Sequence, residues 1–334
     1  MIYLFFASGP LHFINIFEFM KKNKIKKYKI FMLKTKIHRV NSEMFNTIKF
    51  LDLQNIEIIS WNSLKIISFI QYVFFIKKIR SQYCDIKITF VISDFKYLFF
   101  HFLRVFFYRS NFILIDEGSG TIIAYKKYIS RGIYFPIDQY KSVFFNIYKN
   151  LLTKNFRILI YSKFKIFSLY KDYIKDDDIL VNKFENLKRK IKRVIKKDNS
   201  IVLFIGTKLS ERGIISLEEE LKILKKINSY WSFRGKKLIY ISKRTTSDKK
   251  LNLIKKKLSI DYVKFSLPLE LAISEEFNKL PFAICSHGSA LDITLKQIYN
   301  IKSYLYFPKG YEKLFHLDYS NNYIIVSKSE IISI

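Results

Sequence analysis

The chain has 334 residues, 49% of them hydrophobic, with only 9 Gly and 5 Pro, which excludes a disordered or fibrous protein and leaves room for two domains. The formal net charge of +31 is spread along the chain, so it favours attraction to anionic lipids and substrates and argues against a dedicated nucleic-acid surface. The two cysteines and five scattered histidines predict neither a disulfide framework nor a metal centre.

The first half begins with an apolar run at 2–7, a Gly9-Pro10 turn, an amphipathic stretch from 11 to about 23, and a second apolar run at 28–33. This order of strand, turn, helix and strand is typical of a parallel α/β sheet, whose buried strands are almost continuously apolar. We also predict strands at 56–59, 88–92 and 112–115, and a helix at 64–79.

Nothing along the chain predicts a membrane-spanning helix or a signal peptide. The longest charge-free segment, near 66–76, is about half as long as a bilayer span and is bounded by Lys65 and Lys77. We therefore expect a cytoplasmic protein, with peripheral attachment to the anionic inner face of the membrane left open.

A polar, highly charged segment at 176–199 predicts a linker between an N-terminal domain at 1–175 and a C-terminal domain at 200–334. The second domain repeats the alternation of strand and helix, and its predicted strands lie at 200–205, 237–241, 262–265, 282–285 and 303–307. Two such blocks predict two Rossmann-like α/β domains facing across a cleft, which is the GT-B type of fold. Ligands of such folds bind at the carboxyl ends of the strands.

Two adjacent carboxylates, Asp116 and Glu117, directly follow the strand at 112–115, and glycines follow them at 118 and 120. Glycines allow a substrate to approach the backbone closely, and a carboxylate at this edge can act as a general base toward a hydroxyl group. The alternative is an acidic turn that only caps the next element.

The run Ser286-His287-Gly288-Ser289 joins a predicted strand to a predicted helix that begins at Ala290. Free N–H groups, hydroxyls and the helix dipole converge at such a junction and favour a nucleotide phosphate. An ordinary helix cap is the alternative.

Three weaker sites lie in the same half. Lys243 and Arg244 end a strand and could stabilise a leaving phosphate. Glu270 stands in the first turn of a helix, where it could accept hydrogen bonds from ribose hydroxyls or only favour the helix start. The loop that begins at Gly206-Thr207 lacks the ending of a Walker loop and carries a second candidate base, Glu211.

Taken in chain order, these motifs resemble the bacterial lipooligosaccharide sialyltransferases and, more distantly, the capsular polysialyltransferases. The resemblance covers roughly 2–307 and includes an acceptor-side turn with Gly9, Pro10 and His12. It implies a metal-independent, inverting transfer of sialic acid, or a related CMP-activated keto-sugar, from a CMP-sugar to a glycan such as the terminal galactose of lipooligosaccharide or capsule. It also implies that Glu270 binds the ribose and that Ser286 and Ser289 bind the phosphate.

The chain departs from that family at two positions. Lys243 stands where the family has a histidine, and Leu209 stands at the usual position of a carboxylate. These departures keep open a GT-B transferase with a different nucleotide sugar and a non-catalytic homologue. The expected partners are a nucleotide-sugar donor and a glycan or glycolipid acceptor, with no cofactor and no nucleic acid, and a homodimer is also left open.

Overall fold

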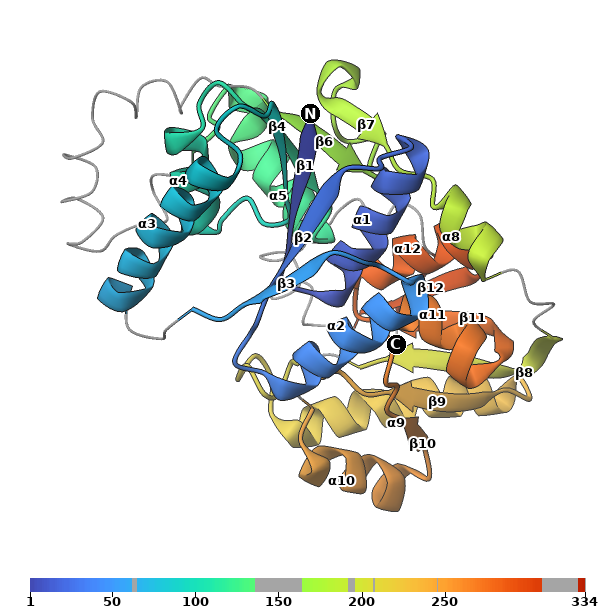
Figure 1. Cartoon of the computed structure of the whole chain (residues 1–334). Coiled ribbons are helices and arrows are strands. Elements are labelled where there is room, and N and C mark those ends of the chain that lie inside the picture. The colour runs from blue at the N-terminus through green and yellow to red at the C-terminus, as the bar shows by residue number, and fades with distance from the viewer. Residues whose placement is uncertain are drawn as a thin grey trace. The chain divides into compact units, whose positions relative to one another are not determined.

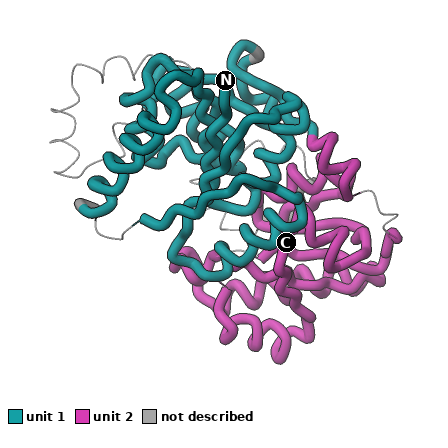
Figure 2. The backbone as a smooth tube through the Cα atoms, in the orientation of Figure 1, with its two compact units in different colours: residues 1–183 teal, residues 184–334 magenta. Residues whose placement is uncertain are grey.

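The computed structural model describes residues 1–61, 65–135, 164–191, 196–206, 208–244, 246–307 and 330–333. The chain divides into two compact units, unit 1 at Met1–Lys183 and unit 2 at Phe184–Ile334 (Figure 2). This boundary falls inside the segment 176–199, where the sequence predicts a linker. In the structure that segment contains the last strand of unit 1, a short helix and the beginning of the first strand of unit 2.

The described part of unit 1 contains a seven-stranded parallel sheet in the order β3-β2-β1-β4-β5-β6-β7 (Figure 1). Its strands are β1 Ile2–Ala7, β2 Tyr28–Leu33, β3 Ile56–Ile59, β4 Ile88–Ile92, β5 Asn111–Ile115, β6 Lys165–Ser168 and β7 Ile179–Val181. Its helices include α1 Pro10–Lys22, α2 His38–Leu51, α3 Lys65–Gln82, α4 Leu98–Phe106 and α5 Ser119–Lys127.

The described part of unit 2 contains a six-stranded parallel sheet in the order β10-β9-β8-β11-β12-β13. Its strands are β8 Lys196–Ile205, β9 Lys237–Ile241, β10 Asp261–Val263, β11 Lys279–Ser286, β12 Lys302–Phe307 and β13 Glu330–Ser333. Its helices include α8 Glu185–Lys190, α9 Leu217–Phe233, α10 Asp248–Leu258, α11 Leu269–Ala272 and α12 Ala290–Tyr299, and a π-helical turn, Ile273–Phe277, continues α11.

Apolar side chains on both faces of the central strands form the core of each unit. In β1, Leu4, Phe5 and Phe6 have no solvent exposure, and in β8 the same holds for Val202 and Leu203. Strands of this kind require helices on both faces of the sheet, which the alternating helices supply. The strand order changes direction between β1 and β4 and between β8 and β11, so the loops after these strands are the expected ligand positions.

The structure confirms the prediction of two parallel α/β domains and adds strands that the sequence did not reveal. Strands β6 and β7 lie beyond the five predicted in the first domain, and β13 follows the strand that was expected to close the second. The helix that the sequence predicts around Glu270 ends at Phe277, because β11 already pairs with β8 from Lys279 onward. Among the described residues, none of the helices combines the length and hydropathy needed to cross a bilayer.

Candidate functional site

Two carboxyl groups of unit 1 share a hydrogen bond at the carboxyl ends of neighbouring strands. The pairing of Ile92 with Leu114 sets the ends of β4 and β5 side by side, and Asp94 and Glu117 follow them. Both side chains are partly exposed, and a hydrogen bond joins them. Burial first, and then the nearby charge of Asp94, raise the pKa of Glu117 to about 8. At neutral pH Glu117 therefore holds a proton that it donates to Asp94.

The backbone on both sides fixes this carboxyl pair. The N–H of Lys96 donates to Oδ1 of Asp94 at 2.7 Å, and the N–H of Glu117 donates to Oγ1 of Thr121 at 3.1 Å. Gly118, with φ of 97°, makes the turn into α5 in a conformation that favours glycine. A Cβ on Gly120 would lie 2.1 Å from Oε1 of Glu117, so glycine at this position leaves room for the carboxyl.

Asp116, the first predicted base, lies inside the unit and has no solvent exposure. Its Oδ2 accepts a hydrogen bond of 2.8 Å from the N–H of Leu169, and its backbone oxygen accepts one of 2.9 Å from Asn15. Burial raises its pKa to about 7, against the hydrogen bonds from Ser168, Leu169 and Thr121. Asp116 thus links β5 to the end of β6 and to α1. Of the two adjacent residues Asp116 and Glu117, only Glu117 has a side chain that is partly exposed to solvent.

The predicted acceptor-side residues form the turn after β1. Gly9 caps α1 in an extended conformation that any residue can adopt, and Pro10 is the first helical residue, where its missing N–H is tolerated. The ring of His12 is buried, and its Nδ1 accepts a hydrogen bond of 3.1 Å from the N–H of Ser8. Neutral His12 therefore carries its proton on Nε2.

The predicted phosphate loop of unit 2 is held by a carboxylate that the sequence did not single out. Asp292 accepts hydrogen bonds from Oγ of Ser286 at 2.7 Å, from the N–H of Ser289 at 2.7 Å and from Oγ of Ser303 at 3.1 Å. Gly288 turns the chain with φ of 93°, and its N–H donates to Oγ of Ser286. Burial raises the pKa of Asp292 to about 6. The loop thus satisfies much of its own hydrogen bonding.

A group of cations lies at the carboxyl end of β9, next to the point where the strand order of unit 2 reverses. Lys243 is half-buried, and burial, followed by the charges of Arg212 and Lys208, lowers its pKa. Asp292 acts in the opposite direction and is therefore close enough to influence Lys243. Arg244 is exposed. An anionic group bound beside Lys243 would relieve the repulsion among these cations.

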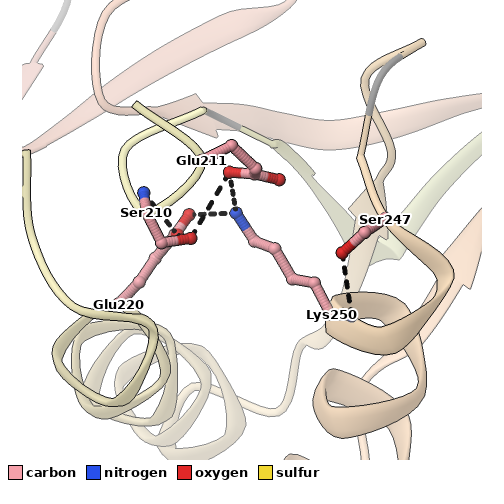
Figure 3. Close-up of polar contacts among 5 residues, drawn as sticks. All are labelled: Ser210, Glu211, Glu220, Ser247 and Lys250. Atoms are coloured by element: carbon pink, nitrogen blue, oxygen red, sulfur yellow. Dashed lines mark hydrogen bonds and ion pairs between the residues drawn. The ribbon is translucent and has the colours of Figure 1, made fainter. Parts of the chain in front are cut away.

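Glu211, the second predicted base, takes part in an ion-pair network (Figure 3). Nζ of Lys250 lies 3.0 Å from Oε2 of Glu211 and 2.6 Å from Oε1 of Glu220. Oγ of Ser210 donates to Oε2 of Glu220 at 2.5 Å. The side chains of Lys250 and Glu220 are almost fully buried, at 2% and 1% exposure. The network links the loop after β8 to α9 and α10. The carboxylate of Glu211 is therefore in an ion pair with Lys250.

The remaining predicted residues pack within unit 2. A Cβ on Gly206 would lie 2.4 Å from the hydroxyl of Tyr240 and 2.8 Å from the backbone oxygen of Ile241, so glycine is needed there for packing against β9. Thr207 lies outside the described residues. Glu270 is 4% exposed, and its Oε1 accepts a hydrogen bond of 3.4 Å from Thr294 of α12.

The sequence reasoning overlooked Asp94, Asp292 and Lys250. Asp94 could have been found, because it follows the correctly predicted strand at 88–92 just as Asp116 follows the next one. Asp292 could have been found as the third residue after a serine cap, the spacing of a capping box. The position of Lys250 offered no cue in a chain with 59 Lys and Arg. Among the described residues, no cluster of three or more His, Cys, Asp or Glu side chains could hold a metal ion.

No protein-family model matches this chain, and no curated protein sequence matches it. Several solved structures do. The match to a candidate UDP-N-acetylglucosamine 2-epimerase of Listeria monocytogenes covers 91% of this chain and 78% of the epimerase chain, with a TM-score of 0.58 and 8% identity. The match to the UDP-GlcNAc 2-epimerase of Methanocaldococcus jannaschii, in complex with UDP-GlcNAc and UDP, covers 91% of this chain and 83% of that chain, with a TM-score of 0.53 and 13% identity. The match to the glycotransferase of kitacinnamycin covers 99% of this chain and 86% of that chain, with a TM-score of 0.51 and 11% identity.

These matches confirm the GT-B type of fold and correct the expected family. The similar structures are UDP-GlcNAc 2-epimerases and a glycosyltransferase, so the sialyltransferase resemblance and the CMP-sialic acid donor are wrong. The lipooligosaccharide and capsule acceptors came only from that resemblance and are withdrawn with it. The physical reason is that short runs of small and acidic residues stand at strand ends throughout parallel α/β proteins, so their order alone does not specify a substrate.

Proposed function

We propose that this chain is an enzyme that binds a UDP-sugar and moves protons on it, most specifically a UDP-GlcNAc 2-epimerase. The observation that carries the proposal is the hydrogen-bonded pair of carboxyl side chains, Asp94 and Glu117, at the adjacent carboxyl ends of β4 and β5. Inverting a carbon that bears hydrogen requires a base to remove a proton from one face and an acid to return one to the other. An ionised carboxyl group can act as the base and a protonated one as the acid, so this pair contains both kinds of group.

The cations of unit 2 support a nucleoside diphosphate as the anchoring part of the substrate. Lys208 and Arg212 both lie within electrostatic reach of Lys243, which follows β9 at the carboxyl edge of the second sheet. A diphosphate carries two to three negative charges and would pair with such a group. Structures of similar fold include one in complex with UDP-GlcNAc and UDP, which points to uracil as the base. Both cysteines are free, which favours the reducing cytoplasm as the site of action.

A second candidate is a GT-B transferase that uses a UDP-sugar donor. It is favoured by the fold match to a glycosyltransferase, which covers 99% of this chain. The same carboxyl pair would then remove a proton from an acceptor hydroxyl. The two candidates differ in a simple respect, because an epimerase converts the UDP-sugar without any acceptor whereas a transferase releases UDP only when an acceptor is present.

The test is to incubate purified protein with UDP-GlcNAc alone and to follow the sugar by proton NMR. We expect a second UDP-sugar isomer to appear, and we expect Asp94→Asn and Glu117→Gln each to lower turnover by about 10²–10⁴-fold. Glu218→Gln, on the exposed start of α9, is the matched control and should retain full turnover. UDP release only with acceptors would favour the transferase. Unchanged UDP-GlcNAc, together with no binding of UDP in calorimetry, would refute both candidates and favour a non-catalytic protein.

A further inference from the structure

Helix α3 of unit 1 carries apolar side chains on two opposite sides, and one of these sides packs on the described part of the unit. Ile76 and Ile79 face inward and are 2% and 1% exposed. On the opposite side Ile67, Ile70 and Phe74 are 39%, 48% and 67% exposed. Their spacing of three and four residues aligns them in one stripe along the helix. Figure 1 shows helix α3 beside α4. Contiguous exposed apolar side chains of this kind mark a surface that binds something.

The same face of α3 becomes basic toward its end. Lys77 and Lys78 continue the stripe at helical spacing and are exposed, and Arg80 is exposed in the last turn. Nζ of Lys78 contacts Glu57 at 2.7 Å, yet its side chain remains 56% exposed. No Asp or Glu occurs between 65 and 82. An apolar stripe about 10 Å long, followed by a cationic end, matches a helix that lies in the plane of an anionic lipid surface.

We propose that this outer face of α3, defined as Ile67, Ile70, Phe74, Lys77 and Lys78, docks on an anionic phospholipid bilayer. The apolar stripe would enter the boundary between headgroups and acyl chains, and the lysines would contact lipid phosphates. The net charge of +31 supports this partner, since a second copy of the chain would bring repulsive charge of the same sign. The proposal does not depend on the enzymatic activity.

The test is co-sedimentation of the whole protein with vesicles of phosphatidylcholine alone or with about one third phosphatidylglycerol. We expect binding to the anionic vesicles and little binding to the neutral ones. Phe74→Ser should reduce the partition coefficient about tenfold, because the phenyl ring no longer enters the bilayer. The matched control is Phe233→Ser on α9, where a single phenylalanine is 90% exposed, and it should bind like the unchanged protein.

A second pair of variants separates a local surface from general charge attraction. Replacing Lys77 and Lys78 with glutamine should lower binding on the order of tenfold, whereas the same change at the exposed pair Lys225 and Lys226 should alter it within about twofold. Equal losses for both pairs would overturn the proposal, and so would binding that is insensitive to Phe74→Ser. A dimer that dissociates on Phe74→Ser would assign the face to a second copy instead. A marked loss of thermal stability in Phe74→Ser would show that the stripe packs against protein, which also overturns the proposal.

Discussion

The carboxyl group of Glu117 occupies the space that a methyl group at position 120 would need. The three atoms nearest to a Cβ built on Gly120 all belong to Glu117, and Oε1 lies 2.1 Å away where ordinary contacts begin at 3.4 Å. Gly120 is the second residue of α5 and does not have a positive φ, so alanine fits the backbone. We therefore expect Gly120→Ala to displace the carboxyl of Glu117 from Asp94 and leave the helix formed.

The size of the effect follows from the distance that the carboxyl must move. Restoring van der Waals contact requires a displacement of at least about 1 Å, and misplacing a catalytic group by that amount can cost about 10²-fold in rate. Alanine gains up to about 1 kcal/mol over glycine in a helix, and a less favourable rotamer of Glu117 costs about 0.5–1.5 kcal/mol. The two contributions to stability nearly cancel, so the free energy of unfolding should change by less than about 1 kcal/mol. Turnover should fall about a hundredfold, because the carboxyl group of Glu117 is displaced.

Steady-state turnover of UDP-GlcNAc, measured together with urea unfolding, tests this prediction. Gly132→Ala is the reciprocal control, since Gly132 has φ of 72° with no atom within 4 Å of its Cβ position. It should lose about 1–2 kcal/mol of stability and keep its turnover number. If Gly120→Ala instead retains turnover within about twofold, Glu117 is not positioned by this glycine and the assignment of the carboxyl pair fails.

Further predictions concern pH and the buried charges. Burial holds the pKa of Asp116 near 7, above its unfolded value of about 3.9, so its contribution to stability is complete below about pH 4 and is lost as the pH rises through 7. In urea unfolding at pH 8, Asp116→Asn should therefore be more stable than the unchanged protein by up to about 4 kcal/mol. Turnover should decline above about pH 8, where Glu117 loses its proton, and a pH–rate profile that stays flat to pH 10 would contradict this. Lys250→Met should cost about 3–5 kcal/mol of unfolding free energy because it leaves two glutamates without their cation, whereas Lys249→Met on the exposed side of α10 should cost little.

Much of the fold was predictable because parallel strands buried on both faces are almost continuously apolar in the sequence. The run at 2–7 and the run at 28–33 are strands β1 and β2 with the predicted bounds. Strand β7 has only three residues and is too short to show a pattern of its own. It is a strand because β6 pairs with it, and the sequence does not reveal that pairing.

The candidate site was predictable only in part, because its chemistry depends on contacts between distant segments. The adjacent carboxylates Asp116 and Glu117 were found from their place after a strand. Which of the two is buried depends on Leu169, 53 positions later, and the proton of Glu117 depends on Asp94, at the end of the neighbouring strand. Similarly, Glu211 looked like a free base until α10 brought Lys250 within 3.0 Å of it.

The central claim is that Asp94 and Glu117 exchange protons with a carbon of a UDP-sugar. Turnover of UDP-GlcNAc in deuterium oxide, with NMR and mass spectrometry of the sugar nucleotide, tests it most directly. We predict that one deuterium enters at carbon 2 in both isomers, and that Asp94→Asn and Glu117→Gln slow its entry in parallel with turnover. Isomers that form without deuterium, or protein that binds UDP yet never incorporates deuterium, would contradict the claim.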